Sequence, residues 1–171
     1  MSGADVHPDD PLLLACRALA RAMDLFDEAA CRALGIGRSD LRALNLLEHG
    51  PLSPAALADA LDLSRSSVTT LLDRLVRAGF VARTDDPHDR RGIRVVLQPE
   101  TFRAFATVYR PLGLQVHASL QHLSAPDRDT VTQGIEAMTA AFEQARSSHR
   151  QPTTHARGRR YAGRDRHPRL D

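Results

Sequence analysis

The sequence contains no lysine and no tryptophan, and aromatic residues make up only 4% of its 171 residues. Because lysine is absent, all 23 residues of the Lys and Arg class are arginines. Contacts of these side chains with anions therefore depend on planar guanidinium forks. No apolar run approaches the roughly 18 residues of a membrane-spanning helix. The first ten residues also lack the basic start and apolar stretch of a secretory signal. We expect a cytoplasmic protein without a membrane span, with residues 1–10 flexible.

Cysteine is scarce, and signatures of catalysis or metal binding are missing from the sequence. Two cysteines in a chain without an export signal argue against a disulfide scaffold. Cys16 lies between Leu12 and Leu19 on a predicted apolar seam, which favours packing over redox sensing. The histidines are scattered, and His117 and His122 are too far apart to share one helix face. Because no nucleophile elbow, phosphate loop or zinc-protease motif occurs, we expect no catalytic residues, no metal and no cofactor.

The positive charge is unevenly distributed along the chain. The net charge of +2 conceals 17 arginines against 19 acids in residues 1–150, and six arginines against two acids in residues 151–171. The C-terminal segment is rich in Arg, Gly and Pro and has too little apolar content to offset the entropy of ordering. We therefore predict an Arg-rich disordered tail over residues 149–171. It either adds non-specific attraction to phosphates or is an inert extension.

Apolar periodicity and capping residues predict a mainly α-helical chain. Ser53 and Ser64 are good helix N-caps, and Gly35 and Gly79 are positioned to end helices. Apolar seams recur at heptad-like spacing over residues 12–30 and 131–142, and such seams require a partner surface. The predicted helices cover residues 11–34, 38–49, 54–61, 65–78, 101–123 and 124–148, with Pro111 and Gly113 expected to kink or interrupt the fifth.

The periodicity changes to that of a strand after Gly79. Residues 80–84 and 93–97 predict two strands, and the polar residues 85–92 predict the loop of a small β-hairpin. A short helix, a tight turn, a capped helix with a polar face and a hairpin together predict a winged helix-turn-helix. Small hydroxyl side chains at the start of the helix 65–78 would allow close approach to a DNA major groove. The positive end of the dipole of this helix, at its N-terminus, favours phosphate.

These segments resemble the MarR family, the multiple antibiotic resistance regulators of bacteria. The resemblance implies a homodimer with dimerisation helices 11–34 and 101–148 and a DNA-binding part over residues 38–98. It also implies a transcriptional regulator, a repressor that binds double-stranded DNA at a pseudo-palindromic operator and is released by a small apolar or aromatic effector. The family often has Thr-x-x-Gly after the second strand, where residues 98–101 here read Gln-Pro-Glu-Thr. The matching segments are Leu61-x-Leu63-Ser64-x-x-x-Val68-Thr69-x-Leu71-Leu72-Asp73-Arg74-Leu75-Val76-x-x-Gly79-Phe80-Val81-x-Arg83, Asp86-Pro87-His88-Asp89-Arg90-Arg91-Gly92 and Val95-x-Leu97.

The candidate DNA-binding residues lie in the predicted recognition helix and in the hairpin, or wing. Arg65 can contact a guanine edge bidentately, with a phosphate contact as the alternative. Arg74 is expected to contact phosphate or to pair with an acid of the wing. The remaining candidates in the helix are Ser64, Ser66, Ser67, Thr69 and Thr70.

In the wing, the resemblance places Arg91 in the minor groove and leaves Arg90 for the DNA backbone. Asp86 and Asp89 are predicted to support the wing by orienting arginines; for Asp89 and Arg91 a purely intraprotein ion pair is the alternative. The competing function is a winged-helix dimerisation or protein-interaction module that binds no operator. Such a module has no need of this array of arginines.

Overall fold

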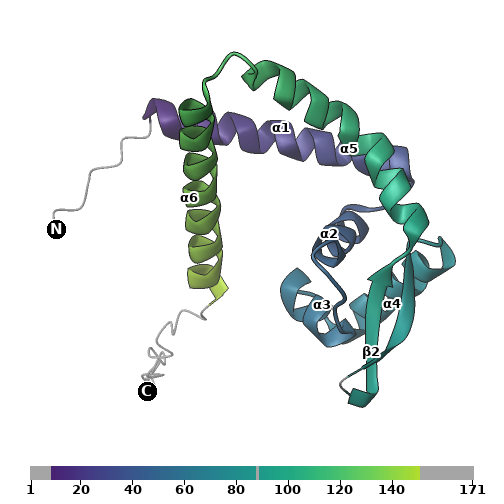
Figure 1. Ribbon diagram of the computed structural model, residues 1–171. Helices are drawn as coiled ribbons and strands as arrows, with labels where there is room; N and C mark the ends of the chain where they lie inside the picture. Colours follow the sequence, from purple (N-terminus) through teal and green to yellow (C-terminus); the bar gives the residue numbers. More distant parts are fainter. Residues whose placement is uncertain (1–8, 88, 151–171) are drawn as a thin grey trace, which may run out of the picture. The chain divides into compact units, whose positions relative to one another are not determined.

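A computed structural model describes residues 9–87 and 89–150, without the side chains of residues 90, 91, 149 and 150. Eight elements follow one another along this part of the chain (Figure 1). Their order confirms the predicted fold class, a mainly α-helical chain with one small β-hairpin. The elements are α1 (Pro11–Leu34), α2 (Arg38–Leu47), α3 (Pro54–Leu61), α4 (Arg65–Arg77), β1 (Val81–Asp86), β2 (Asp89–Leu97), α5 (Pro99–Leu120) and α6 (Ala125–Arg150).

The short helices α2, α3 and α4 and the hairpin share one apolar core. Leu44, Leu57, Leu72 and Val95, one from each element, are at most 1% exposed. Ser53 and Ser64 accept hydrogen bonds from backbone N–H groups in the first turns of α3 and α4, as their N-cap positions predict. These caps fix where each helix begins. The buried apolar stripe then decides which face of α4 points inward and which faces solvent.

The wing is longer than the sequence predicts. Asp85 pairs with Ile93 and Asp86 with Asp89, so most of the predicted loop 85–92 is strand. The prediction was wrong because Asp, Pro and Gly are turn residues by propensity, whereas pairing across the hairpin carries the strands further. Leu52, in the connection before α3, adds a bridge to Val95 through two backbone hydrogen bonds of 3.2 and 2.8 Å. This bridge ties the wing to the helices.

The helix α5 begins at Pro99 and continues through Pro111 to Leu120. Of the predicted kink or interruption at Pro111 and Gly113, the interruption does not occur, and the helix starts two residues earlier than predicted. Thr101, which is 1% exposed, donates a hydrogen bond of 2.6 Å to the carbonyl of Phe80. A buried hydroxyl bonded in this way anchors the start of α5 to the segment between α4 and β1.

The helix α1 packs on the core only near its C-terminal end. Ala30 is 1% exposed, and the ring of Phe26 meets that of Tyr109 on α5 at 5.3 Å between centroids. By contrast, Leu12 and Met23, which belong to the predicted seam, are 64% and 60% exposed. Leu12, Leu19 and Met23 of this seam are thus largely exposed in the described part of the single chain.

The described chain divides into two units between Ala118 and Ser119. The second unit consists mainly of α6, whose start is capped by Ser124: the Asp127 N–H donates to Ser124 Oγ at 3.3 Å. Val131, Ile135 and Phe142 of its predicted seam are 37%, 48% and 64% exposed. The helix reaches Arg150, two residues into the predicted tail; residues 151–171 lie outside the described residues, as do residues 1–8. Within the described part, none of the helices has the length and apolar character of a membrane span.

Candidate nucleic-acid interface

The solvent-facing side of α4 is built from small hydroxyl residues and arginine. Val68, Leu71, Leu72 and Leu75 form the buried stripe of this helix. Their spacing turns the other residues outward, and all the predicted contact positions of α4 are exposed. The helix thus presents a polar face made largely of short side chains at its N-terminal end. The exposed residues are Ser64, Arg65, Ser66, Ser67, Thr69, Thr70 and Arg74.

Most hydroxyls of this face also hold the helix together. Ser64 Oγ accepts from the Ser67 N–H at 3.1 Å and shares hydrogen bonds of 2.9 and 2.8 Å with the hydroxyls of Ser66 and Ser67. Thr69 and Thr70 donate to the carbonyls of Arg65 and Ser66, at 2.9 and 3.1 Å. Because their protons are used within the helix, the two threonines present methyl groups and oxygen lone pairs to an approaching partner.

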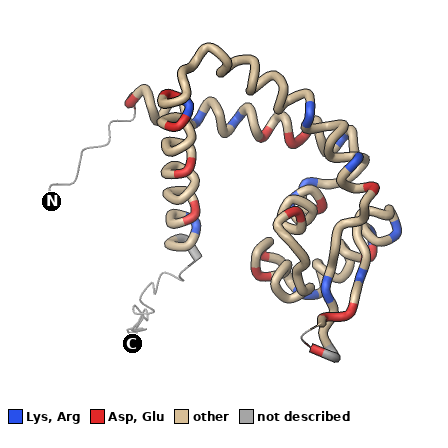
Figure 2. The backbone as a smooth tube through the Cα atoms, viewed as in Figure 1, with Lys and Arg blue, Asp and Glu red and all other residues tan. Residues whose placement is uncertain are grey.

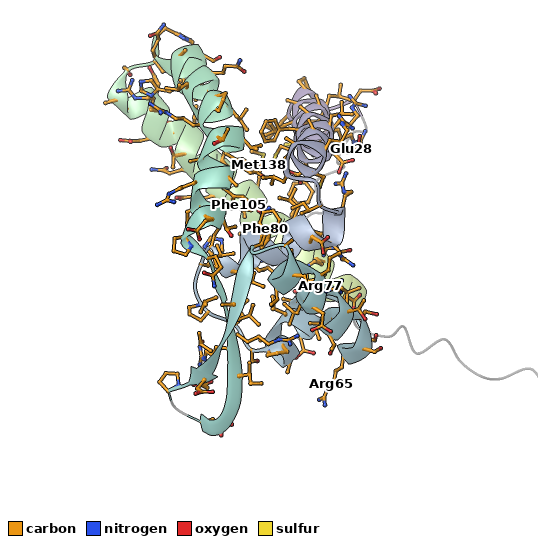
Figure 3. The ribbon with its side chains drawn as sticks, turned by 90° about the vertical axis from the view of Figure 1, so that its right-hand side faces the viewer. Glu28, Arg65, Arg77, Phe80, Phe105 and Met138 are labelled. Atoms are coloured by element: carbon orange, nitrogen blue, oxygen red, sulfur yellow. The ribbon has the colours of Figure 1, made fainter. Side chains whose placement is uncertain are left out.

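Arg65 projects away from the body of the first unit at the start of α4 (Figure 3). A hollow of about 590 Å³ lies beside it, formed where the first turns of α3 and α4 meet the wing. The hollow brings together a basic side chain, hydroxyl groups and the acids of the wing that the sequence predicted to belong to one site. Its lining residues are Ser53, Pro54, Ala55, Arg65, Thr69, Asp86, Asp89, Gly92 and Ile93.

Acidic and basic residues follow one another along the wing (Figure 2). Asp86 accepts a hydrogen bond of 2.8 Å from Arg94 Nε, and Arg94 Nη1 donates to the Pro51 carbonyl at 3.2 Å. Asp86 therefore orients Arg94. The backbones of Arg90 and Arg91 belong to β2, and their side chains lie outside the described residues.

Arg74 uses its guanidinium within the protein. It donates from Nε and Nη2 to the two carboxylate oxygens of Asp40, at 3.0 and 2.5 Å. These hydrogen bonds raise the pKa of Arg74 above its ordinary value. Arg74 thus pairs with Asp40 in the first turn of α2, and not with an acid of the wing, which was one of the two predictions. Sequence reasoning missed Asp40, whose only local signal is an acid placed three residues after Gly37 at a helix start.

A second hollow, of about 540 Å³, lies between α2 and α5. Its wall combines aromatic rings with polar groups, and burial is the main cause that raises the pKa of the Tyr109 phenol, helped by the charges of Asp27 and Glu48. Asn45 lies close enough to oppose that shift without reaching hydrogen-bond geometry. The lining residues are Asn45, Glu48, His49, Phe102, Phe105, Ala106 and Tyr109.

The described residues offer no group of three or more His, Cys, Asp or Glu side chains that could hold a metal ion. Cys31 is 7% exposed, and burial raises the pKa of its thiol although the positive charge of Arg38 acts in the opposite direction. Cys16 is partly buried. Reactive cysteines lie in electropositive and exposed surroundings, and neither Cys16 nor Cys31 is exposed.

Comparison with known sequences decides the family. The sequence pattern of the MarR family matches residues 34–92. YfiV of Bacillus subtilis, an uncharacterized HTH-type transcriptional regulator, is 32% identical over 123 residues, which cover 71% of this chain and 77% of YfiV. The chain belongs to the MarR family. It is thus a member of a family of transcriptional regulators with the winged-helix fold.

Other members of the MarR family match over shorter stretches. YcgE of Bacillus subtilis, another uncharacterized HTH-type regulator, is 40% identical over 98 residues, 57% of this chain and 64% of YcgE. The multiple antibiotic resistance protein MarR of Salmonella typhimurium is 29% identical over 83 residues, 48% of this chain and 58% of that protein. The matched segments thus span less than two thirds of either relative.

Solved structures of MarR-type regulators share the fold of this MarR-family chain. A transcriptional regulator of Thermotoga maritima superposes with a TM-score of 0.60 at 22% identity, covering 80% of this chain and 97% of the other. Wild-type MarR of Escherichia coli in its apo form gives a TM-score of 0.55 at 22% identity, covering 77% and 98%. At such identities the likeness concerns the fold alone.

Proposed function

We propose that this protein is a homodimeric, sequence-specific regulator that binds double-stranded DNA at a pseudo-palindromic operator and represses transcription until a small effector releases it. The observation that carries the proposal is the exposed face of α4. Its short side chains, with Arg65 at the N-terminal end, suit insertion into a major groove. The adjacent wing supports a second contact, in which Arg91 enters the minor groove and Arg90 contacts the DNA backbone.

The proposal of a homodimer rests on apolar side chains that lack cover. Leu19 and Met23 of α1 are 50% and 60% exposed, and Leu114 of α5 is 61% exposed. Exposed apolar side chains of this number mark interaction surfaces in soluble proteins. Val131, Ile135 and Phe142 of the seam on α6 are also exposed. Together these helices supply the dimerisation region over residues 11–34 and 101–148, and residues 38–98 supply the part that binds DNA.

The hollow between α2 and α5 is the proposed effector site. Its volume of about 540 Å³ falls within the range of roughly 300–1,000 Å³ typical of small-molecule sites. Phe102, Phe105 and Tyr109 suit an apolar or aromatic ligand, and Asn45 and His49 offer a few polar contacts. An effector bound there would lower DNA affinity only if it binds more tightly to a form with poorly spaced recognition helices.

A salt-controlled selection of bound sequences from a random pool of double-stranded DNA tests the proposal. The expected result is a two-fold symmetric consensus with half-sites about one helical turn, roughly 10 base pairs, apart. Affinity for the consensus should exceed that for random DNA by at least about a thousandfold at the same salt concentration. A chain that enriches no sequence while remaining folded would favour the alternative of an interaction module without operator binding.

A further inference from the structure

Asp40 is the one charged side chain among the buried residues of the described chain, at 2% exposure. It accepts three N–H donors: the backbone N–H of Gly37 at 3.1 Å, and Nε and Nη2 of Arg74 at 3.0 and 2.5 Å. A carboxylate held from two directions is fixed in place. Asp40 therefore ties the start of α2 to the outer part of α4.

Arg74 is in a different environment. Its side chain is 52% exposed, and its Nη1 has no partner among the described residues. It follows Ser66 and Thr70 at four-residue intervals, so it continues their exposed stripe along α4. One edge of the guanidinium is thus anchored by Asp40, and the other edge faces solvent on the side that carries the recognition residues.

We propose that Asp40 is a positioning residue for DNA binding, which holds the guanidinium of Arg74 so that its free edge contacts a phosphate beside the major groove. The inference rests on the proposed function. An arginine fixed by a carboxylate loses little conformational entropy when it meets a phosphate, whereas a mobile arginine must be ordered at that moment. Asp40 itself touches no DNA and acts through Arg74.

The substitution Asp40→Asn isolates this role because it preserves shape. An amide oxygen in the place of Oδ2 can still accept from the Gly37 N–H and from Arg74 Nε, but the NH₂ group then faces the N–H donors of Nη2. The guanidinium fork is then no longer held at both of its nitrogens. The substitution also raises the net charge of the chain by one. Simple electrostatics therefore predicts tighter binding to DNA, whereas loss of positioning predicts weaker binding.

The experiment measures affinity for the selected operator as a function of salt, with the full-length wild type, Asp40→Asn and a matched control, Asp24→Asn. Asp24, whose side chain is 62% exposed, pairs on the surface with Arg38, whose side chain is 46% exposed, so the control makes the same change of charge. We expect Asp40→Asn to bind roughly tenfold more weakly, the size of a lost charge-assisted hydrogen bond. The control should bind as tightly as wild type or more tightly.

The salt dependence separates positioning from loss of fold. A plot of the logarithm of the DNA-binding constant against the logarithm of the salt concentration has a negative slope. Losing one phosphate contact should make this slope shallower by about 0.9, whereas a smaller folded fraction leaves the slope unchanged. Asp40→Asn in an Arg74→Met background should cause no further loss, because Asp40 acts only through Arg74. Equal affinity and slope for Asp40→Asn and Asp24→Asn would overturn the inference. A wild type that selects no sequence would instead count against the proposed function.

Discussion

The pair of Asp40 and Arg74 bears both on the stability of the fold and on the proposed contact with DNA. The carboxylate is 2% exposed and the guanidinium side chain 52% exposed, so the two ends of the ion pair have different solvation. Removing the arginine leaves a buried carboxylate without a cationic partner, whereas removing both charges does not. The stability of the chain and its proposed contact with DNA therefore depend on the same pair but respond differently to substitution.

Arg74→Met should lower the free energy of unfolding by about 1–3 kcal/mol, less than for a fully buried pair because Arg74 is half exposed. Adding Asp40→Asn to that variant should recover part of the loss, since the unpaired carboxylate disappears. Urea unfolding followed by circular dichroism measures all three proteins. A double variant less stable than Arg74→Met alone would contradict this description of the pair.

Cys31 provides a pH-dependent prediction. Burial raises the pKa of its thiol, so the folded state holds the proton over a range of pH in which the unfolded chain has lost it. Its contribution to stability is full below the ordinary thiol pKa of about 8.5 and is lost as pH rises toward the raised value. The stability difference between wild type and Cys31→Ala should therefore narrow as the pH rises above about 8.5. A difference that is constant across this range would be inconsistent with a buried thiol.

Local patterns along the chain predicted the helices well, for reasons that concern single elements. The serine caps at Ser53 and Ser64 and the apolar stripe of α4 lie within a few residues of each other in sequence, so composition and spacing suffice. The wing depends instead on pairing between Asp85 and Ile93, which turn propensities do not reveal. Asp40 was missed for the same reason, because its partner lies 34 residues away.

Gly92 controls the geometry of the wing. A Cβ atom at this position would lie 2.9 Å from the Cβ of Asp86 and 3.1 Å from that of Asp89, closer than real Cβ atoms approach in the first case. Gly92→Ala should therefore displace the two strands near the tip of the hairpin and weaken DNA binding about tenfold or more. The helical core is distant from this contact, so thermal unfolding should shift little. Unchanged operator affinity would show that the tip of the wing does not contact DNA.

At the scale of the whole molecule, net charge is a poor guide to the proposed partner. Residues 1–150 carry more acids than arginines, so attraction to DNA must come from placement rather than from the total. Arg65 stands free at the start of α4, whereas Arg74 and Arg94 are held by Asp40 and Asp86. The sequence could predict which residues are basic, but the partners of these arginines follow from the fold.

Residues 151–171 hold the positive surplus of the sequence, with six arginines and two acids. Truncation after Arg150 should reduce affinity for random DNA and flatten its salt dependence, because fewer counterions are released on binding. Affinity should be measured by fluorescence anisotropy at several salt concentrations, with the full-length chain as reference. An identical salt slope for both proteins would mean that the segment is an inert extension.

The central claim is that the exposed face of α4 reads base sequence, and Arg65 tests it most directly. The measurement is a parallel selection from random DNA with wild type and Arg65→Ala at one salt concentration. If Arg65 contacts a guanine edge, the variant should lose the preference at one position in each half-site, about 1–3 kcal/mol of discrimination, and keep the rest of the consensus. An unchanged consensus with uniformly weaker binding would show that Arg65 contacts only phosphate and would contradict the claim.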